Sequence, residues 1–240
     1  MADIDTVRER VAGAKRLAVL TGAGMSAESG VPTFRGPGGL WRNHRAEDLA
    51  TPEAFSRDPK LVWEWYDMRR TKVAQAAPNA GHHALVALEN RLPGFSLITQ
   101  NVDGLHRLAG STDPVEMHGN IWKVRCTACN GITEDRRVPI PIPPSCNVCG
   151  ALLRPHIVWF GESLDADVLE RAFAAFEYCD VALIVGTSGV VQPAASLAGL
   201  ARRVGAFVAE INPEPTPATE AVDVALLGKA GEILPQLVPG

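Results

Sequence analysis

The feature that most constrains the fold is a series of short apolar runs, each of which ends abruptly in a polar loop. The runs cover 17–21, 95–99, 181–185, 206–211 and 224–227, and the first four lead into Gly22-Ala23-Gly24, Gln100-Asn101-Val102-Asp103, Gly186-Thr187-Ser188 and Asn212-Pro213-Glu214. Apolar runs of this length are typical of strands that are buried on both faces of a sheet. Helical patterns at 80–91 and 165–177 lie between them. The alternation predicts an α/β fold built on a Rossmann-like parallel sheet.

The polar loops predict a single binding site, because ligands of parallel sheets bind at the carboxyl ends of the strands. The motif GAGMSA, which begins at Gly22, fits the pattern G-x-G-x-x-G/A, in which glycines let the backbone approach a pyrophosphate. A tight structural turn explains this motif equally well. The acidic ribose ligand of dehydrogenases, expected about 20 residues later, is missing from a strand end.

Two stretches do not fit the sheet. Residues 36–79 contain Trp-rich helical segments, and 122–155 contain four of the five cysteines and a Pro-rich run that cannot be helical. We expect both stretches to form a smaller lobe inserted into the sheet. The predicted organisation is one catalytic domain, 1–240, with a Rossmann-like lobe at 1–38, 80–121 and 155–240 and a small lobe at 39–79 (helical) and 122–154 (zinc module).

The four cysteines of the insert carry the most specific metal signal in the chain. Cys126, Cys129, Cys146 and Cys149 form the pattern C-x2-C-x16-C-x2-C, which is typical of tetrahedral zinc sites. Four thiolates leave no open coordination position, so the predicted zinc is structural. The alternative, four reduced cysteines without a metal, would leave the insert with little core. Cys179 is expected to be a small buried hydrophobe.

Composition excludes several classes of protein. The chain is 46% apolar and carries 23 Lys and Arg against 27 Asp and Glu, so it should fold and should not bind nucleic acid or anionic membrane electrostatically. Met1 to Val11 has no apolar signal-peptide core, and every apolar run is far shorter than the roughly 20 residues that span a bilayer. The expected compartment is the cytoplasm, where cysteines stay reduced.

Three polar residues outside the loops are candidates for the site. His118 lies between the loop at 100–106 and the cysteine segment, so it should face the cleft between the lobes, where a neutral imidazole can act as a general base. A structural histidine is an equal alternative. Tyr66 and Arg69 share one helix face and together offer a hydroxyl and a planar fork to a carboxylate. The residues alone favour a solvated helix face.

Taken together, these motifs resemble the sirtuins, the NAD-dependent protein lysine deacylases. The matching stretches run in the family's order from Leu17 to about Ala230 and comprise GAGMSAESGVPTFRG, TQNVDGLHRLAG, MHGN, the paired C-x-x-C turns, PHIVWFGE, GTSGVVQPA and INPE. The resemblance implies that NAD is cleaved rather than used for hydride transfer. It also implies that the partners are acylated lysine side chains of proteins, and that the products are the deacylated lysine side chain, nicotinamide and O-acyl-ADP-ribose.

The resemblance further implies a role for individual residues. The acyl-lysine oxygen attacks the nicotinamide ribose as nicotinamide leaves, and His118, with Asn101 beside it as a second catalytic residue, then activates a ribose hydroxyl. The implied NAD contacts are Gly22, Ala23, Gly24, Phe34, Arg35, Trp41, Gln100, Asn101, Val102, Asp103, Gly186, Thr187, Ser188, Asn212, Pro213, Glu214 and Ala230. The substrate peptide pairs as an added strand with the segment that holds Val158, Phe160 and Gly161.

Tyr66 and Arg69 resemble a pair found in class III sirtuins, whose acyl pocket accepts succinyl, malonyl or glutaryl groups. Ala50 resembles the small residue that keeps that pocket wide. The resemblance therefore implies desuccinylation at least as efficient as deacetylation, with both activities retained. Three alternatives remain at this point: a protein ADP-ribosyltransferase, a Rossmann oxidoreductase, and a zinc-ribbon nucleic-acid-binding regulator. The acidic balance of the chain argues against the last of these.

Overall fold

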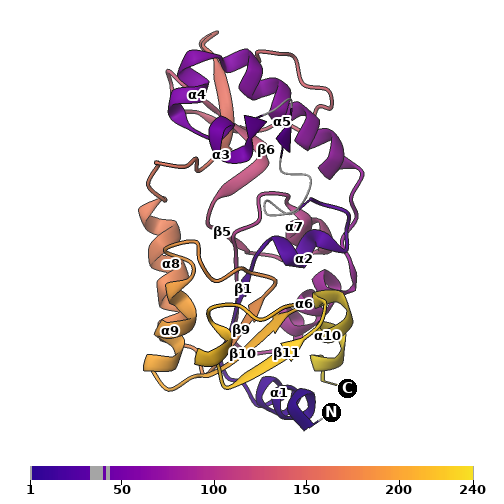
Figure 1. The fold of residues 1–240 in the computed structure, drawn as a ribbon. Coiled ribbons are helices and arrows are strands. Elements are labelled where there is room, and N and C mark those ends of the chain that lie inside the picture. The colour runs from indigo at the N-terminus through magenta and orange to yellow at the C-terminus, as the bar shows by residue number, and fades with distance from the viewer. Residues whose placement is uncertain (1, 33–39, 42–43, 240) are drawn as a thin grey trace.

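The computed structural model describes residues 2–32, 40–41 and 44–239 and is organised around a six-stranded parallel sheet (Figure 1). The strand order is β11-β10-β9-β1-β4-β5, formed by β1 (Leu17–Thr21), β4 (Phe95–Thr99), β5 (Val115–Glu116), β9 (Val181–Val185), β10 (Phe207–Asn212) and β11 (Val224–Leu227). Thr21 pairs with both Thr99 and Val185, so the three central strands end at one level. The predicted α/β class and parallel sheet are confirmed.

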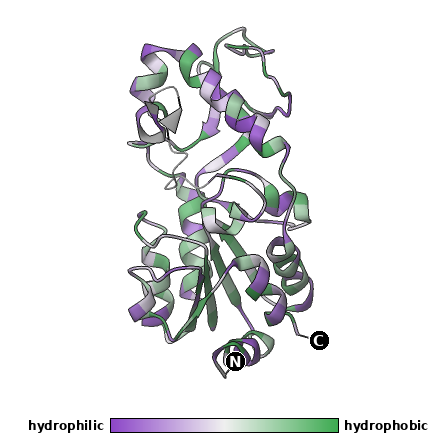
Figure 2. Ribbon diagram, turned by 45° about the vertical axis from the view of Figure 1, so that its right-hand side comes forward, coloured by the Kyte–Doolittle hydropathy of each residue, from purple (hydrophilic) through white to green (hydrophobic). Residues whose placement is uncertain are grey.

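Helices cover both faces of this sheet, as the predicted burial of the strands requires. Along β1, Leu17 and Val19 face one apolar cluster, whereas Ala18 and Leu20 face another. The first cluster is completed by α1 (Ala2–Ala12), α6 (Ala80–Arg91) and α10 (Ala230–Leu237), and the second by α8 (Ala166–Glu177) and α9 (Ser196–Arg203). Figure 2 shows the hydrophobic strands between helices whose outer faces are hydrophilic. The result is a three-layer arrangement.

A smaller lobe lies beyond the carboxyl ends of the strands, at the top of Figure 1. It contains the helices α3 (Ala46–Leu49), α4 (Pro52–Arg57) and α5 (Pro59–Ala74), and an antiparallel sheet of β6 (Gly119–Cys126), β7 (Ile132–Glu134) and β8 (Leu153–Ile157). Its core is aromatic, with Trp63, Trp65, Tyr66, Trp122 and Trp159 all buried. The short hairpin of β2 (Leu40–Trp41) and β3 (His44–Arg45) lies beside these elements.

The helix α5 begins at a well-formed cap. The Asp58 side chain accepts a hydrogen bond from the Leu61 N–H at 2.9 Å, and Pro59 occupies the first turn, where its missing N–H costs nothing. The remaining elements are the short helices α2 (Ala23–Ala27), α7 (Leu105–Ala109) and η1 (Thr219–Ala221). Among the helices of the described residues, none has the length and apolar character needed to cross a membrane.

Candidate active site and metal centre

The loops that follow β1 and β9 pack directly on one another. Gly24 N–H donates to the Gly186 carbonyl at 2.8 Å, and Gly22 N–H donates to Val185 at 3.0 Å. A Cβ atom on Gly22 would lie 2.8 Å from the Gly186 oxygen, and one on Gly186, whose φ is +59°, would lie 2.5 Å from Met25 N. Glycine is therefore required here for contact between two loops, which is a structural reason separate from any approach of a pyrophosphate.

Thr187 joins three of the predicted loops. Its hydroxyl oxygen accepts a hydrogen bond from Gln100 Nε2 at 3.0 Å, and its carbonyl accepts one from Asn212 Nδ2 at 3.1 Å. The residues that follow, Ser188 on one loop and Pro213 and Glu214 on another, are partly or fully exposed. The structure thus brings these predicted NAD contacts to one edge of the sheet.

Asn101 is held firmly at the centre of this edge. Its Nδ2 donates to the Gly22 carbonyl at 2.9 Å and to Ser26 Oγ at 3.1 Å, and its side chain is buried. Asp103 lies on the same turn, where burial raises the pKa of its carboxyl although the Leu105 N–H donates to it. Val102, between them, is buried in the core of the smaller lobe. The loop after β4 therefore contacts both lobes.

His118 lies at the junction of the two lobes, directly before β6. Its Nδ1 is 3.1 Å from the Gln100 carbonyl oxygen, which can only accept, so Nδ1 carries the proton and Nε2 keeps its lone pair in the neutral ring. Burial lowers the pKa of His118, and the hydrogen bond to Gln100 opposes this shift. Gly119, with φ of +80°, follows, and a Cβ there would lie 2.2 Å from the His156 oxygen. Only glycine allows this turn.

Ala230, the predicted adenine contact, is buried at the first turn of α10. The carboxylate of Glu28 accepts the N–H of Gly231 at 2.7 Å, which ties the end of α2 to that turn. Ala23 lies in the first turn of α2. Phe34 and Arg35 fall outside the described residues, and Trp41 lies in β2 without a described side chain.

Tyr66 and Arg69 are not on a solvated helix face. Tyr66 is 1% exposed, and burial raises its pKa to about 12. Arg69 is partly buried, with its Cζ 4.9 Å from the centroid of the Trp65 ring and 5.9 Å from that of Tyr66, and burial lowers its pKa. The two side chains therefore present a neutral hydroxyl and a guanidinium close together.

The segment predicted to pair with substrate peptide is anchored at both ends. Val158 N–H donates to the His118 carbonyl at 3.0 Å, and Phe160 N–H donates to the Ala50 carbonyl at 2.9 Å. The Phe160 side chain is 53% exposed, and Gly161 follows with φ of +84°. The structure thus connects three predicted site regions through this segment.

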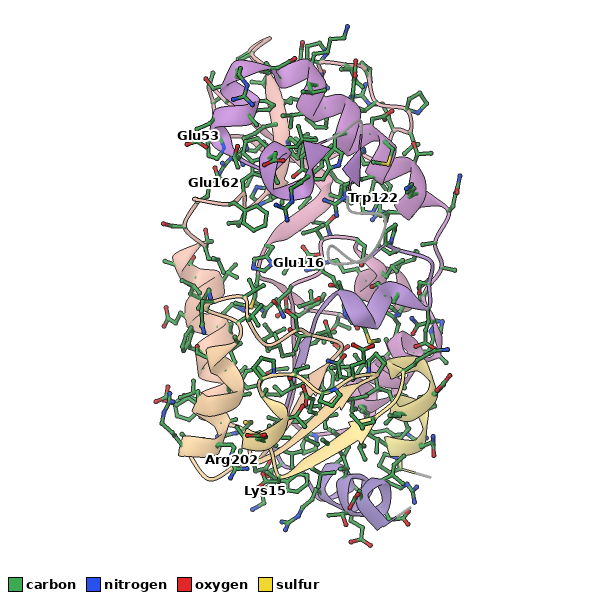
Figure 3. All side chains as sticks on the ribbon, in the orientation of Figure 1. Lys15, Glu53, Glu116, Trp122, Glu162 and Arg202 are labelled. Atoms are coloured by element: carbon green, nitrogen blue, oxygen red, sulfur yellow. The ribbon has the colours of Figure 1, made fainter. Side chains whose placement is uncertain are left out.

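Sequence reasoning missed the residues that hold this segment in place. Arg154 pairs with Glu162 through two contacts of 2.6 and 2.8 Å, and its Cζ lies 3.5 Å from the centroid of the Trp159 ring. Figure 3 labels Glu162 in the smaller lobe. The signal available in the sequence is the pair of opposite charges at Arg154 and Glu162, eight residues apart on either side of Trp159.

The four insert cysteines form a cluster of the right size for zinc. Their Sγ atoms all lie within 4.8 Å of one another, with Cys126–Cys149 at 3.4 Å and Cys129–Cys146 at 3.9 Å. A tetrahedral site with Zn–S bonds of about 2.3 Å places its sulfurs about 3.8 Å apart, so the donor set fits a structural zinc ion. Cys179 follows α8 and is buried in an apolar cluster of the larger lobe, where burial raises its pKa to about 11.

Each turn of the cluster ends in a left-handed residue. Asn130 has φ of 58° after Cys129, and Gly150 has φ of 75° after Cys149. The N–H groups of Ala128 and Cys129 lie 3.4 and 3.5 Å from Cys126 Sγ. Such donors favour the thiolate form that a metal binds.

The helix α5 is bonded to the zinc module along its length. Trp63 Nε1 donates to the Leu153 carbonyl at 2.8 Å, and Asp67 Oδ1 accepts from Ile140 N at 2.8 Å. Arg70, fully buried, donates to the carbonyls of Ile121, Asp135 and Arg137. The module therefore supports the helix that carries Tyr66.

Comparison with known proteins agrees with this geometry. The model of the Sir2 family matches residues 22–193. An NAD-dependent protein deacylase of Aquifex aeolicus is 56% identical, with 89% of this chain and 90% of the relative covered. NAD-dependent protein deacylase 1 of Archaeoglobus fulgidus is 52% identical, with 95% and 94% covered.

Solved structures give the same result. A Sir2 homologue in complex with NAD is 50% identical and superposes with a TM-score of 0.93, covering 98% of this chain and 92% of its own. A complex of Sir2 with a p53 peptide and NAD⁺ is 29% identical, with a TM-score of 0.86 and coverage of 96% and 95%.

Proposed function

Because the chain belongs to the Sir2 family, we propose that this NAD-dependent protein deacylase removes both acetyl and succinyl groups from lysine side chains. The observation that carries the succinyl assignment is the pair of Tyr66 and Arg69 in the smaller lobe. Malonyl and glutaryl groups share the same terminal carboxylate and fall within the same proposal.

The physical argument for a carboxylate starts from the cost of burial. Moving a guanidinium out of water is unfavourable, and an added carboxylate beside Arg69 recovers part of that free energy. Tyr66 stays protonated because burial raises its pKa to about 12, so its hydroxyl remains a donor. Ala50, whose carbonyl accepts the Phe160 N–H, adds little side-chain volume to the apolar cluster that contains Tyr66.

The geometry of His118 and Asn101 supports their assignment as catalytic residues. Bound NAD supplies an electrophilic ribose carbon when nicotinamide leaves. His118, with Nδ1 donating to Gln100, holds a lone pair on Nε2 and accepts the proton of a ribose hydroxyl. Asn101 is oriented by Gly22 and Ser26, which fixes the amide at the centre of the site. The substrate peptide adds a strand beside 158–161.

The remaining assignments concern NAD and the organisation of the chain. We assign the NAD contacts to the loops joined by Thr187, to α2 and to the first turn of α10. We assign the larger lobe to 1–38, 80–121 and 155–240, and the smaller to 39–79 and 122–154. A thiolate zinc cluster and a buried free thiol suit a reducing compartment, which supports a cytoplasmic location.

Mass spectrometry of acetyl- and succinyl-lysine peptides incubated with NAD tests the function. The expected products are the free lysine peptide, nicotinamide and the O-acyl-ADP-ribose of each acyl group. His118→Tyr is the control and should abolish both reactions. Removal of acetyl alone would contradict the succinyl assignment, and ADP-ribose left on a protein would instead indicate an ADP-ribosyltransferase.

A further inference from the structure

The hydrogen bond between Trp159 and Tyr66 has a defined direction. Trp159 Nε1 lies 2.8 Å from the Tyr66 hydroxyl oxygen, inside the aromatic core of the smaller lobe. An indole N–H can only donate, so the hydroxyl oxygen is the acceptor. The hydroxyl proton must therefore point toward a different acceptor.

Among the described residues, the Tyr66 hydroxyl makes no hydrogen bond besides the one from Trp159. Tyr66 also remains protonated across the physiological range, because burial raises its pKa to about 12. The charge that acts most strongly on Tyr66 is cationic, and it belongs to Arg69, whose Cζ lies 5.9 Å from the Tyr66 ring centroid. A donor hydroxyl beside a guanidinium is suited to an anionic oxygen from a ligand.

Trp159 is itself fixed by three contacts. The Arg154 guanidinium lies over its ring, with 3.5 Å from Cζ to the ring centroid, and the Phe55 ring centroid lies 5.2 Å from its own. Its backbone N–H donates to Glu162 Oε2 at 2.9 Å, and Glu162 also pairs with Arg154. The indole therefore has little freedom to rotate away from Tyr66.

The position of Trp159 along the chain connects it to the reaction. The residues before and after it donate backbone hydrogen bonds to His118 and Ala50. The same short segment thus holds the proposed peptide strand outside and the indole inside. A substitution of Trp159 should therefore affect the proposed acyl site through its hydrogen bond to Tyr66.

We propose that Trp159 is a specificity-determining positioning residue. By occupying the acceptor side of the Tyr66 hydroxyl, its indole N–H directs the hydroxyl proton toward the terminal carboxylate of succinyl-type acyl groups. This inference rests on the proposed function, because it needs a carboxylate-bearing acyl substrate.

Trp159→Phe tests the proposal, since it keeps an aromatic ring and removes the N–H. The KM for a succinyl-lysine peptide should rise about tenfold with kcat unchanged, as expected when a bond made equally in the ground and transition states is weakened. The KM for the matched acetyl-lysine peptide should change less than twofold. In a Tyr66→Phe background, Trp159→Phe should have no further effect on the succinyl KM.

Trp63→Phe is the matched control. It also removes a buried indole N–H, but this one lies on α5 and donates to the Leu153 carbonyl rather than to Tyr66. It should lower thermal stability without changing the ratio of succinyl to acetyl KM. Equal losses for both acyl groups in Trp159→Phe, or the same loss with and without the Tyr66 hydroxyl, would overturn the proposal. If the wild type removes acetyl but not succinyl, the proposed function fails and this inference fails with it.

Should Trp159→Phe fail to fold, the indole resonances of the wild type give the test. The chain has five tryptophans, so its ¹⁵N-indole spectrum is simple. Tyr66→Phe and added succinyl-lysine peptide should each shift the Trp159 resonance, whereas acetyl-lysine peptide should leave it near its free position. A Trp159 resonance that is unmoved by Tyr66→Phe would contradict the hydrogen bond itself.

Discussion

The Nδ1 atom of His118 lies 3.1 Å from the carbonyl oxygen of Gln100, whose side chain donates to Thr187 Oγ1 at 3.0 Å. One residue thus sets the tautomer of the imidazole and the position of the next loop. The bare Nε2 is left as the basic atom.

The pH dependence of the reaction follows from the burial of His118. Burial lowers its pKa below the usual value of 6.5, more than the Gln100 hydrogen bond raises it. A base acts only when unprotonated, so kcat/KM should fall with decreasing pH through a midpoint below 6.5. The profile of kcat/KM for an acetyl-lysine peptide at saturating NAD checks this. A midpoint above 6.5 would show that burial does not control this group.

Arg69→Met should separate the two acyl activities. Loss of a charge-assisted hydrogen bond costs about 1.5–3 kcal/mol, so succinyl kcat/KM should drop at least about tenfold. An acetyl group has no terminal carboxylate to contact Arg69, so kcat/KM for the acetyl peptide should change less than about threefold. Lys72→Met, which removes an exposed cation from the same helix, is the control and should affect neither. Unchanged succinyl turnover in Arg69→Met would contradict the acyl-site assignment.

Arg70→Met should lower the stability of the protein, in contrast to Arg69→Met at the adjacent position, which should change the acyl preference. The Arg70 guanidinium is fully buried and donates to the carbonyl of Ile121 and to two carbonyls of the zinc module, those of Asp135 and Arg137, and the methionine would leave all three without this donor. The expected loss is about 3 kcal/mol or more in the free energy of unfolding, measured by urea titration. Arg136 is exposed, and its guanidinium also lies over the Trp122 ring, so Arg136→Met is the control. It should lower the free energy of unfolding by less than about 1 kcal/mol. Similar losses for both variants would show that the buried contacts add nothing.

Removal of the metal should damage the smaller lobe first. The purified protein should contain one zinc ion per chain by elemental analysis, and Cys146→Ser should lose it. Because α5 is bonded to the zinc module, loss of zinc should lower both the melting temperature and the turnover of every acyl substrate. Cys179→Ser is the control, since that thiol is buried away from the cluster, and it should keep a full zinc content. Full activity in a zinc-free protein would contradict the supporting role.

The sequence predicts the buried strands well because their signal is local. The runs at 17–21, 95–99 and 181–185 coincide with β1, β4 and β9. The edge strand β5, only two residues long, is invisible because periodicity needs more than one repeat. The C-x-x-C spacing also suffices for the metal cluster, since the ligands carry their own turn geometry.

Long-range packing explains what the sequence could not predict. Local reasoning places Tyr66 on a solvated face, but Tyr66 is buried because α5 packs against a module whose strands come 50 or more residues later. The tie between Trp159 and Tyr66 spans 93 residues and has no local signal. Likewise, the mutual approach of Gly22 and Gly186 depends on the register of two distant strands.

The two neighbouring arginines of α5 make different contacts. Arg70 donates hydrogen bonds to the zinc module, whereas Arg69 lies beside the ring of Tyr66. The side chains that hold α5 to the zinc module are therefore separate from the side chain of Arg69. Arg69 is the residue to replace when the proposed acyl preference is to be altered, because Tyr66 belongs to the buried core and residues 63, 67 and 70 bond the zinc module. Under the proposed function, a change of acyl preference made at Arg69 leaves the contacts that hold α5 to the zinc module intact.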